Sequence, residues 1–261
     1  MLLLTAARRK RLRSQPISPD WGRILAHSVP LYDVLPETDR QELHGHLQVF
    51  LAEKGFEGVN GLSVTEEMRV IVAANACLML LHREHDYYPG LSTVILYPGE
   101  YMGRRVETDD LGIVWEEDEV RSGESWGGGS LVLSWEDVRL SGQAGYEDYN
   151  VVIHEFAHQW DLLDGITEPA PLFGRKSARR LWSEYLAEDY AWLCAEVDAG
   201  NEETLLDTYA AMSPGEFFAV ASEAFFQLPQ ALREWHPQVY DGLSRYFRQD
   251  PAGWEWRCQI D

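Results

Sequence analysis

The feature that most restricts the fold is a short pattern near the middle of the chain, H-E-F-A-H, which runs from His154 to His158. It follows directly on a largely apolar run, residues 149–153. On a helix, residues four positions apart lie on one face about one turn apart, so both imidazoles could bind one metal ion. Glu155 would then lie close to the metal without being a ligand, which suits a general base acting on metal-bound water. The pattern predicts a helix that carries the zinc site of a hydrolase, most often a peptidase.

A pattern this short also occurs by chance, so the prediction needs a third ligand. Catalytic zinc typically has three protein ligands and one open position for water. We favour Glu216, because Ser213 and Pro214 are suited to begin a helix whose first turn contains this glutamate. The apolar residues that follow would anchor that helix in the core. The competing interpretation is that Glu216 only completes a capping box with Ser213.

Asp164 is the second candidate for the third ligand. From His154 onward the chain can be written H-E-x-x-H-x-x-D-x-x-D, close to an extended zinc signature in which a glycine turns the chain back. Asp161 occupies the position of that glycine and resists the turn. We expect Asp164 to end the helix, with Gly165 as its C-cap.

The charge of the chain excludes some partners. Acidic residues outnumber basic ones 43 to 22, which gives a formal net charge of −21. Such an excess repels nucleic acids and anionic membrane surfaces and favours solubility. We therefore expect neither direct nucleic-acid binding nor a membrane partner.

The cysteines and the N-terminus predict a cytoplasmic location. Cys77, Cys194 and Cys258 are too few and too scattered for a disulfide framework. At the N-terminus three leucines precede the basic residues, which reverses the order of a signal peptide. No stretch approaches the ~20 apolar residues that cross a bilayer. We expect residues 1–19 to form a flexible basic N-terminal arm and residues 20–261 to form a single domain.

Hydrophobic periodicity predicts helices, then strands, then helices. Helices are expected over residues 39–54, 68–82 and 176–199 and from Pro214 onward. Thr65 should cap the second of these, which is apolar nearly all round and therefore buried, with Cys77 in its core. Strands are expected over residues 93–97, 113–115 and 130–135, in a small antiparallel or mixed sheet. This order predicts an α+β fold.

Three glycines, Gly127 to Gly129, precede the last expected strand. They favour a flexible turn. The alternative is close backbone approach at an edge strand, to which an extended peptide substrate could add through backbone hydrogen bonds.

Two segments together resemble a known family. The segments H-E-F-A-H-Q-W-D from residue 154 and E-F-F-A-V-A-S-E-A-F-F from residue 216 resemble the Mlc titration factor A family of zinc peptidases. They are more distantly similar to the catalytic domain of anthrax lethal factor. The resemblance covers roughly residues 20–255. It implies a zincin-like metallopeptidase fold over residues 20–261, with one Zn²⁺ per chain.

The resemblance also implies roles for individual residues. The metal ligands would be His154, His158 and Glu216, with Glu155 as general base. The related toxin domain has a tyrosine seven residues before its ligand glutamate, which corresponds to Tyr209 here. By resemblance, this hydroxyl could hydrogen-bond the oxyanion or assist the leaving amine.

Two further acidic residues could orient a metal-bound histidine. Glu223 lies two helical turns after Glu216 and could accept a hydrogen bond from a metal-bound histidine. Asp161 could do the same, although a buried structural role is an equal alternative for both. None of the remaining six histidines is assigned to a site.

The function predicted is a zinc-dependent peptidase of the gluzincin type, with aminopeptidase-like activity as one form, acting on a peptide or protein. The alternative is a regulatory binding protein that sequesters a transcriptional repressor of sugar uptake, since members of the resembling family are named for this. Proteolysis would then be secondary. A purely structural zinc site is less consistent with Glu155 and with a carboxylate ligand.

Overall fold

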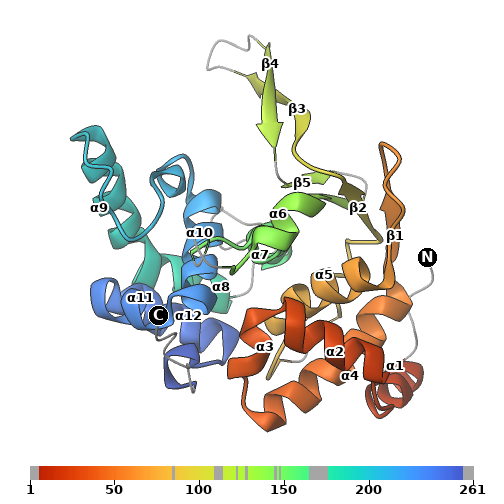
Figure 1. Cartoon of the computed structure of the whole chain (residues 1–261). Coiled ribbons are helices and arrows are strands. Elements are labelled where there is room, and N and C mark those ends of the chain that lie inside the picture. Colours follow the sequence, from red (N-terminus) through yellow and green to blue (C-terminus); the bar gives the residue numbers. More distant parts are fainter. Residues whose placement is uncertain are drawn as a thin grey trace.

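The structure is a computed structural model that describes residues 6–83, 86–108, 114–121, 123–126, 129–143, 146, 148–164 and 176–254, with the backbone alone for 101–126, 164 and 176–178. Helices form most of the described chain (Figure 1). They are α1 (Ala6–Arg13), α2 (Pro19–Ser28), α3 (Pro30–Val34), α4 (Glu37–Glu53), α5 (Glu66–Leu78), α6 (Trp135–Leu140), α7 (Val151–Asp164), α8 (Lys176–Leu181), α9 (Ala187–Asp198), α10 (Pro214–Gln227), α11 (Pro229–Trp235) and α12 (Pro237–Phe247).

A small mixed sheet packs against α7. Its order is β1 (Gly55–Gly58), β2 (Thr93–Tyr97), β6 (Ser130–Ser134) and β5 (Gly123–Trp126). The first three strands are parallel, and β5 is antiparallel to β6. Strands β3 (Tyr101–Thr108) and β4 (Val114–Arg121) form a separate antiparallel hairpin that extends away from the sheet (Figure 1). The α+β arrangement and the strand over residues 93–97 are confirmed, while the strand expected over 113–115 is longer and its first residue lies outside the described residues.

Gly129, the last glycine before β6, lies in a turn. Gly129 has φ +82°, and a Cβ there would lie 2.8 Å from the carbonyl oxygen of Gly90. Its own carbonyl accepts hydrogen bonds from the Ser92 backbone N–H at 2.7 Å and from the Ser92 hydroxyl at 2.9 Å. The alternative of close backbone approach thus holds at Gly129, but not at an edge strand, because β6 lies between β2 and β5. Gly127 and Gly128 lie outside the described residues.

Helix α5 is the buried helix that the sequence predicts. The Thr65 hydroxyl accepts the N–H of Met68 at 3.2 Å and caps the first turn. Ten of its residues are buried, including Cys77. It ends at Leu78 rather than at residue 82, because the next N–H groups bond three residues back and His82 has φ 59°. The helix is nevertheless buried over most of its length, as expected.

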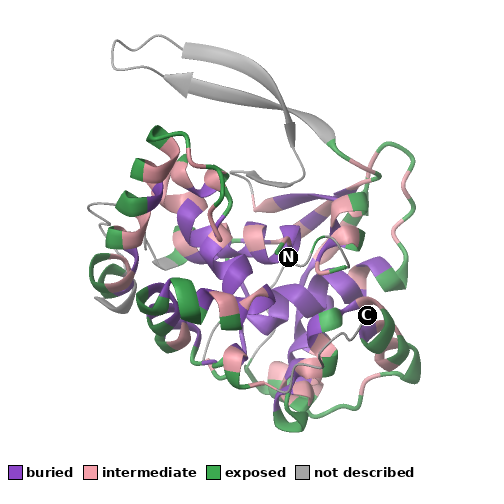
Figure 2. Ribbon diagram, turned by 60° about the vertical axis from the view of Figure 1, so that its left-hand side comes forward, coloured by how far each residue is buried: buried purple, intermediate pink, exposed green. Residues whose placement is uncertain are grey.

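Helices α7 and α10 pack side by side at the centre of the molecule, where buried residues are most concentrated (Figure 2). Helix α5, which belongs to the N-terminal half of the chain, packs against α7. Helix α12, which belongs to the C-terminal half, packs against α10. The two central helices bury aromatic and aliphatic side chains against each other and their neighbours, among them Phe156, Phe217, Phe218 and Phe225. This packing holds the polar side chains of α7 and α10 in fixed positions.

The helix expected over residues 176–199 is divided. A π-helical segment, η1 (Trp182–Leu186), separates α8 from α9. Tyr185 of this segment approaches α12 so closely that a Cβ at Gly242 would lie 2.5 Å from the Tyr185 Cβ. Local periodicity does not predict such a bulge, since it depends on the neighbouring helix.

The N-terminal segment differs from the expected flexible arm. Residues 6–13 form α1, which lies against α4. Arg9 donates to both carboxylate oxygens of the buried Glu53, at 2.6 and 2.9 Å. A bidentate pair of this kind fixes the helix through charge and geometry together. The basic composition of the segment did not indicate this docking.

Two of the three cysteines lie in the described residues, and Cys77 is in the core, as predicted. Cys77 is fully buried, Cys194 is partly buried, and both are free thiols. Cys258 lies outside the described residues. In the described part of the chain, each helix is too short or too polar to cross a lipid bilayer.

Candidate metal centre

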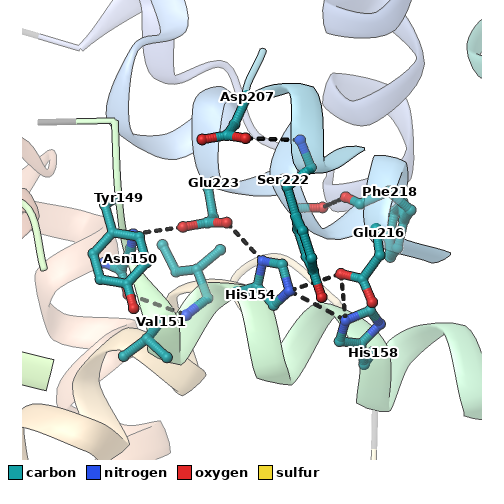
Figure 3. A network of polar contacts seen from close by, with 12 residues as sticks. Tyr149, Asn150, Val151, His154, His158, Asp207, Glu216, Phe218, Ser222 and Glu223 are labelled. Carbon is teal, nitrogen blue, oxygen red and sulfur yellow. Dashed lines mark hydrogen bonds and ion pairs between the residues drawn. The ribbon is translucent and has the colours of Figure 1, made fainter. Parts of the chain in front are cut away.

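Helix α7 presents two histidines to one point. Asn150 begins this helix: its side-chain oxygen accepts the N–H of Ile153 at 3.1 Å. His154 and His158 follow one turn apart, and their Nε2 atoms lie 3.3 Å from each other (Figure 3). The pair is therefore arranged as the sequence pattern predicts.

Helix α10 brings Glu216 to the same point. Ser213 accepts the N–H of Glu216 at 3.2 Å and Pro214 is the first helical residue, as expected. The carboxylate Oε2 of Glu216 lies 3.1 Å from His154 Nε2 and 3.3 Å from His158 Nε2. The serine half of the capping box is thus present, but the glutamate side chain is directed to the histidines of α7.

These three atoms fit a metal ion. His154, His158 and Glu216 are a group in the described residues whose ligand atoms could hold one. The atoms are 3.1 to 3.3 Å apart. Ligand atoms about 2.0–2.1 Å from a tetrahedral zinc ion are about 3.3–3.4 Å from one another. Two imidazoles and one carboxylate are also a donor set that zinc accepts in catalytic sites.

Glu223, two turns along α10, orients His154 from behind. His154 Nδ1 donates to Glu223 Oε1 at 2.7 Å, and the Asn150 backbone N–H donates to Glu223 Oε2 at 2.6 Å (Figure 3). With its proton on Nδ1, a neutral His154 directs the Nε2 lone pair toward Glu216 and His158. Carboxylates placed in this way fix the tautomer of a metal-binding histidine. The structure therefore places Glu223 in the orienting position that was one of its two predicted alternatives.

The electrostatics of the site favour a positive charge at its centre. Burial by itself raises the pKa of Glu216, but hydrogen bonds from His154 and His158 outweigh it and hold this pKa well below its usual range. Burial lowers the pKa of His154, but the carboxylates of Glu223 and Glu216 outweigh it and raise this pKa well above its usual value. Metal ligands must be deprotonated, so His154 would have to lose its Nε2 proton to hold a metal ion.

Glu155 is buried beside the histidines, with 6% of its surface exposed. Burial raises the pKa of its carboxyl, and the charges of His154 and His158 offset part of this rise. A carboxylate with a raised pKa is a stronger base than a solvent-exposed one, which is what proton abstraction near neutral pH requires. The side chain is thus chemically suited to the role that the motif predicts.

Tyr209 lies at the rim of the site. It belongs to a 3₁₀ turn, η2 (Thr208–Ala211), whose first turn is capped by Asp207 through the Tyr209 N–H at 2.7 Å. The centre of the Tyr209 ring is 6.3 Å from that of His154, and about half of the residue is exposed. The ring is therefore beside His154 and partly open to solvent.

The two aspartates of α7 have different positions. Asp164 is the last described residue of α7; its side chain and the predicted C-cap, Gly165, lie outside the described residues. Asp161 is partly buried beneath the start of α10, since a Cβ at Gly215 would be 3.8 Å from Asp161 Oδ2. The same Cβ would be 3.9 Å from His158 Cε1, so Asp161 lies near that ligand.

Sequence reasoning missed two buried asparagines next to the site. Asn150 caps α7 and binds Glu223, and its side-chain amide donates to Asn75 of α5 at 3.0 Å. An asparagine directly before an apolar helical run is a capping signal that could have indicated the first. A single polar residue inside an apolar helix could have indicated the second.

The fold and the site define a class: a histidine pair and a glutamate on two packed helices, with a buried glutamate beside them, as in metallopeptidases. The chain belongs to the glucose-regulated metallo-peptidase M90 family, whose sequence model matches residues 4–248.

Relatives align over nearly the whole chain. An uncharacterized protein of Synechocystis sp. is 37% identical over 245 residues, which cover 94% of this chain and 89% of the relative. The Mlc titration factor A of Serratia proteamaculans is 34% identical over 248 residues, 92% of this chain and 91% of the relative. The Mlc titration factor A of Yersinia pestis is 34% identical over 233 residues, which cover 87% of this chain and 83% of the relative. The resemblance to the Mlc titration factor A family is thus confirmed.

Proposed function

We propose that the chain is a zinc peptidase of the gluzincin type, with a zincin-like fold over residues 20–261. One observation carries the proposal: Glu216 Oε2 is within 3.3 Å of both His154 Nε2 and His158 Nε2. In this proposal His154, His158 and Glu216 hold one Zn²⁺. Family membership supports it, because a metallopeptidase requires a metal ion.

The proposed mechanism assigns the proton transfers to Glu155. Zinc bound at such a site supplies Lewis acidity toward a water molecule and toward the scissile carbonyl. Glu155 removes a proton from the attacking water and delivers it to the leaving nitrogen, so the carboxylate is restored after each cycle. The hydroxyl of Tyr209 donates a hydrogen bond to the developing oxyanion. Glu223 keeps His154 in the tautomer whose Nε2 is free to bind metal.

Strand β5 is the proposed place for the backbone of the substrate. It is the last strand of the sheet in the described residues, and it packs against α7. An extended peptide can add to such an edge through backbone hydrogen bonds, which bind many sequences. This would bring a peptide bond toward the ligands of α7.

The test combines metal analysis with cleavage of a peptide library that includes an Ala-rich aminopeptidase substrate. The proposal predicts about one zinc per chain and cleavage by the wild type that is lost in Glu155→Gln. Cleavage from free N-termini alone would identify an aminopeptidase, and cleavage of blocked peptides an endopeptidase. A Glu155→Gln variant that still cleaves at the wild-type rate would contradict the mechanism.

A second candidate function is regulatory binding. Two relatives are named Mlc titration factor A, and by this likeness the chain would sequester a transcriptional repressor of sugar uptake in the cytoplasm, with proteolysis secondary. Cleavage of the same peptide library distinguishes the two candidate functions. One zinc per chain without cleavage of any peptide favours binding, and a purified repressor that forms a complex equally well with Glu155→Gln supports it further.

A further inference from the structure

A chain of buried hydrogen bonds connects α5 to the candidate metal ligands. It begins at Asn75, whose side-chain Nδ2 donates to the backbone carbonyl of Ile71 at 3.0 Å. The Asn75 Oδ1 then accepts from Asn150 Nδ2, also at 3.0 Å. Because the donor of Asn75 is held by α5 itself, its oxygen is directed toward Asn150. The amide is thus fixed in one orientation.

Asn150 is in turn hydrogen-bonded to both helices of the site, α7 and α10. Its side-chain oxygen caps α7 through the N–H of Ile153 at 3.1 Å. Its backbone N–H donates to Glu223 of α10 at 2.6 Å, and the other oxygen of Glu223 holds His154 Nδ1 at 2.7 Å (Figure 3). Four hydrogen bonds in sequence therefore connect the Ile71 carbonyl to the His154 ring.

The burial of the two amides makes their role specific. Asn75 is 5% exposed, Asn150 is 2% exposed and Glu223 is 4% exposed. Most neighbours of Asn75 along α5 are buried apolar residues, so packing alone would favour an apolar side chain here. A buried amide is unfavourable unless its groups are bonded, and networks of this kind rigidify a core when every member is satisfied.

We infer that Asn75 is a positioning residue of the metal centre, acting through Asn150 and Glu223 on the orientation of His154. It touches no ligand, and it lies on a helix that contributes none. The inference rests on the proposed function, in which His154 binds zinc. Loss of the Asn75 oxygen leaves Asn150 Nδ2 without its partner and frees the Asn150 backbone to shift, which would let Glu223 and the His154 ring rotate.

The test is the zinc dissociation constant of the full-length chain, measured by competition with a chromophoric chelator. Asn75→Leu removes the amide but keeps the number and branching of the side-chain heavy atoms, and it should raise the constant about tenfold, the lower end of the effect of residues that hold metal ligands in place. Gln249→Leu is the matched control. Gln249 is also 5% exposed, and its amide donates to the α5 carbonyl of Leu78 at 2.9 Å, without a link to the site. It should leave the zinc constant within twofold.

Urea unfolding of the metal-free proteins completes the test, since both leucine variants should lose stability. A tenfold weaker zinc affinity in Asn75→Leu alone supports the inference. Equal affinities in both variants and the wild type overturn it and make Asn75 a packing residue. If Asn75→Leu does not fold, Asn75→Ala is measured with the same two criteria. A wild type that binds no zinc removes the proposed function itself, which is a different result from unequal variants.

Discussion

Two groups of histidines and carboxylates in this molecule invite comparison. The metal cluster consists of His154, His158 and Glu216. The α4 cluster consists of Asp39, Glu42, His46 and His82. Both combine two imidazoles with acidic side chains, and both lie where helices pack. Their composition alone does not separate a metal site from a structural network.

The direction of the ring nitrogens separates them. In the metal cluster both Nε2 atoms face one carboxylate oxygen. In the α4 cluster the two nitrogens of His82 face different carboxylates, Asp39 at 3.2 Å and Glu42 at 3.3 Å. Those of His46 face Glu42 at 3.2 Å and the Tyr87 hydroxyl at 2.9 Å. Convergence on one point, rather than residue type, therefore indicates metal binding.

We expect the largest effect when a histidine of the metal cluster is replaced. His154→Ala should weaken zinc binding by more than about 10³-fold, because only three protein side chains would hold the ion. His82→Ala in the α4 cluster should change it less than twofold. Chelator competition on both variants measures the difference. Equal losses would mean that the α4 cluster binds the metal too.

The next effect concerns chemistry rather than binding. Glu155→Gln should lower kcat by about 10² to 10³-fold on any peptide that the wild type cleaves, because the base is lost while the ligands remain. Zinc content should stay at the wild-type level. A variant that has lost its zinc would instead make Glu155 a part of the metal centre.

A smaller effect is expected behind the ligands. Glu223→Gln should raise the zinc dissociation constant about 10- to 100-fold, because a neutral amide holds the His154 N–H less strongly. Glu42→Gln changes the carboxylate that contacts His46, and it serves as the control, with zinc affinity unchanged. If the two variants behave alike, Glu223 does not orient a ligand.

The smallest effect is a pH dependence of stability in the α4 cluster. Burial lowers the pKa of His46, and the hydrogen bond to Glu42 offsets part of this. The folded protein therefore binds a proton at His46 less readily than the unfolded chain does. The contribution of neutral His46 to the free energy of unfolding is complete above the unfolded pKa of about 6.5, and it is lost as pH falls through the folded pKa. Urea unfolding of metal-free protein should show the advantage of wild type over His46→Gln shrinking from pH 7.5 to 5.5, by at most about 1.4 kcal/mol per pH unit. An advantage that grows over this range contradicts the assigned environment.

Short sequence patterns predicted which side chains of the site share a helix face and where the helices begin. The spacing of His154 and His158 needs only a helix, and Ser213 with Pro214 starts the helix that carries Glu216. The placement of Glu223 follows from the same helical period. Thr65 likewise marks the start of α5 through its own capping hydrogen bond.

Contacts between distant segments could not be predicted in this way. His46 is fully buried, and its ring lies against Tyr87, which comes from a segment 41 residues later in the chain. Asn75 and Asn150 are far apart in the chain and meet only when α5 packs on α7. The docking of α1 through Arg9 depends equally on a distant partner, Glu53.

The central claim is that one metal ion binds where the ligand atoms converge. Anomalous diffraction from zinc-loaded crystals, collected on both sides of the zinc absorption edge, tests it most directly. We expect one strong peak about 2 Å from His154 Nε2, His158 Nε2 and Glu216 Oε2, and none at the α4 cluster. A peak that is ligated by Asp164 instead of Glu216, or no peak between the two histidines, would contradict it.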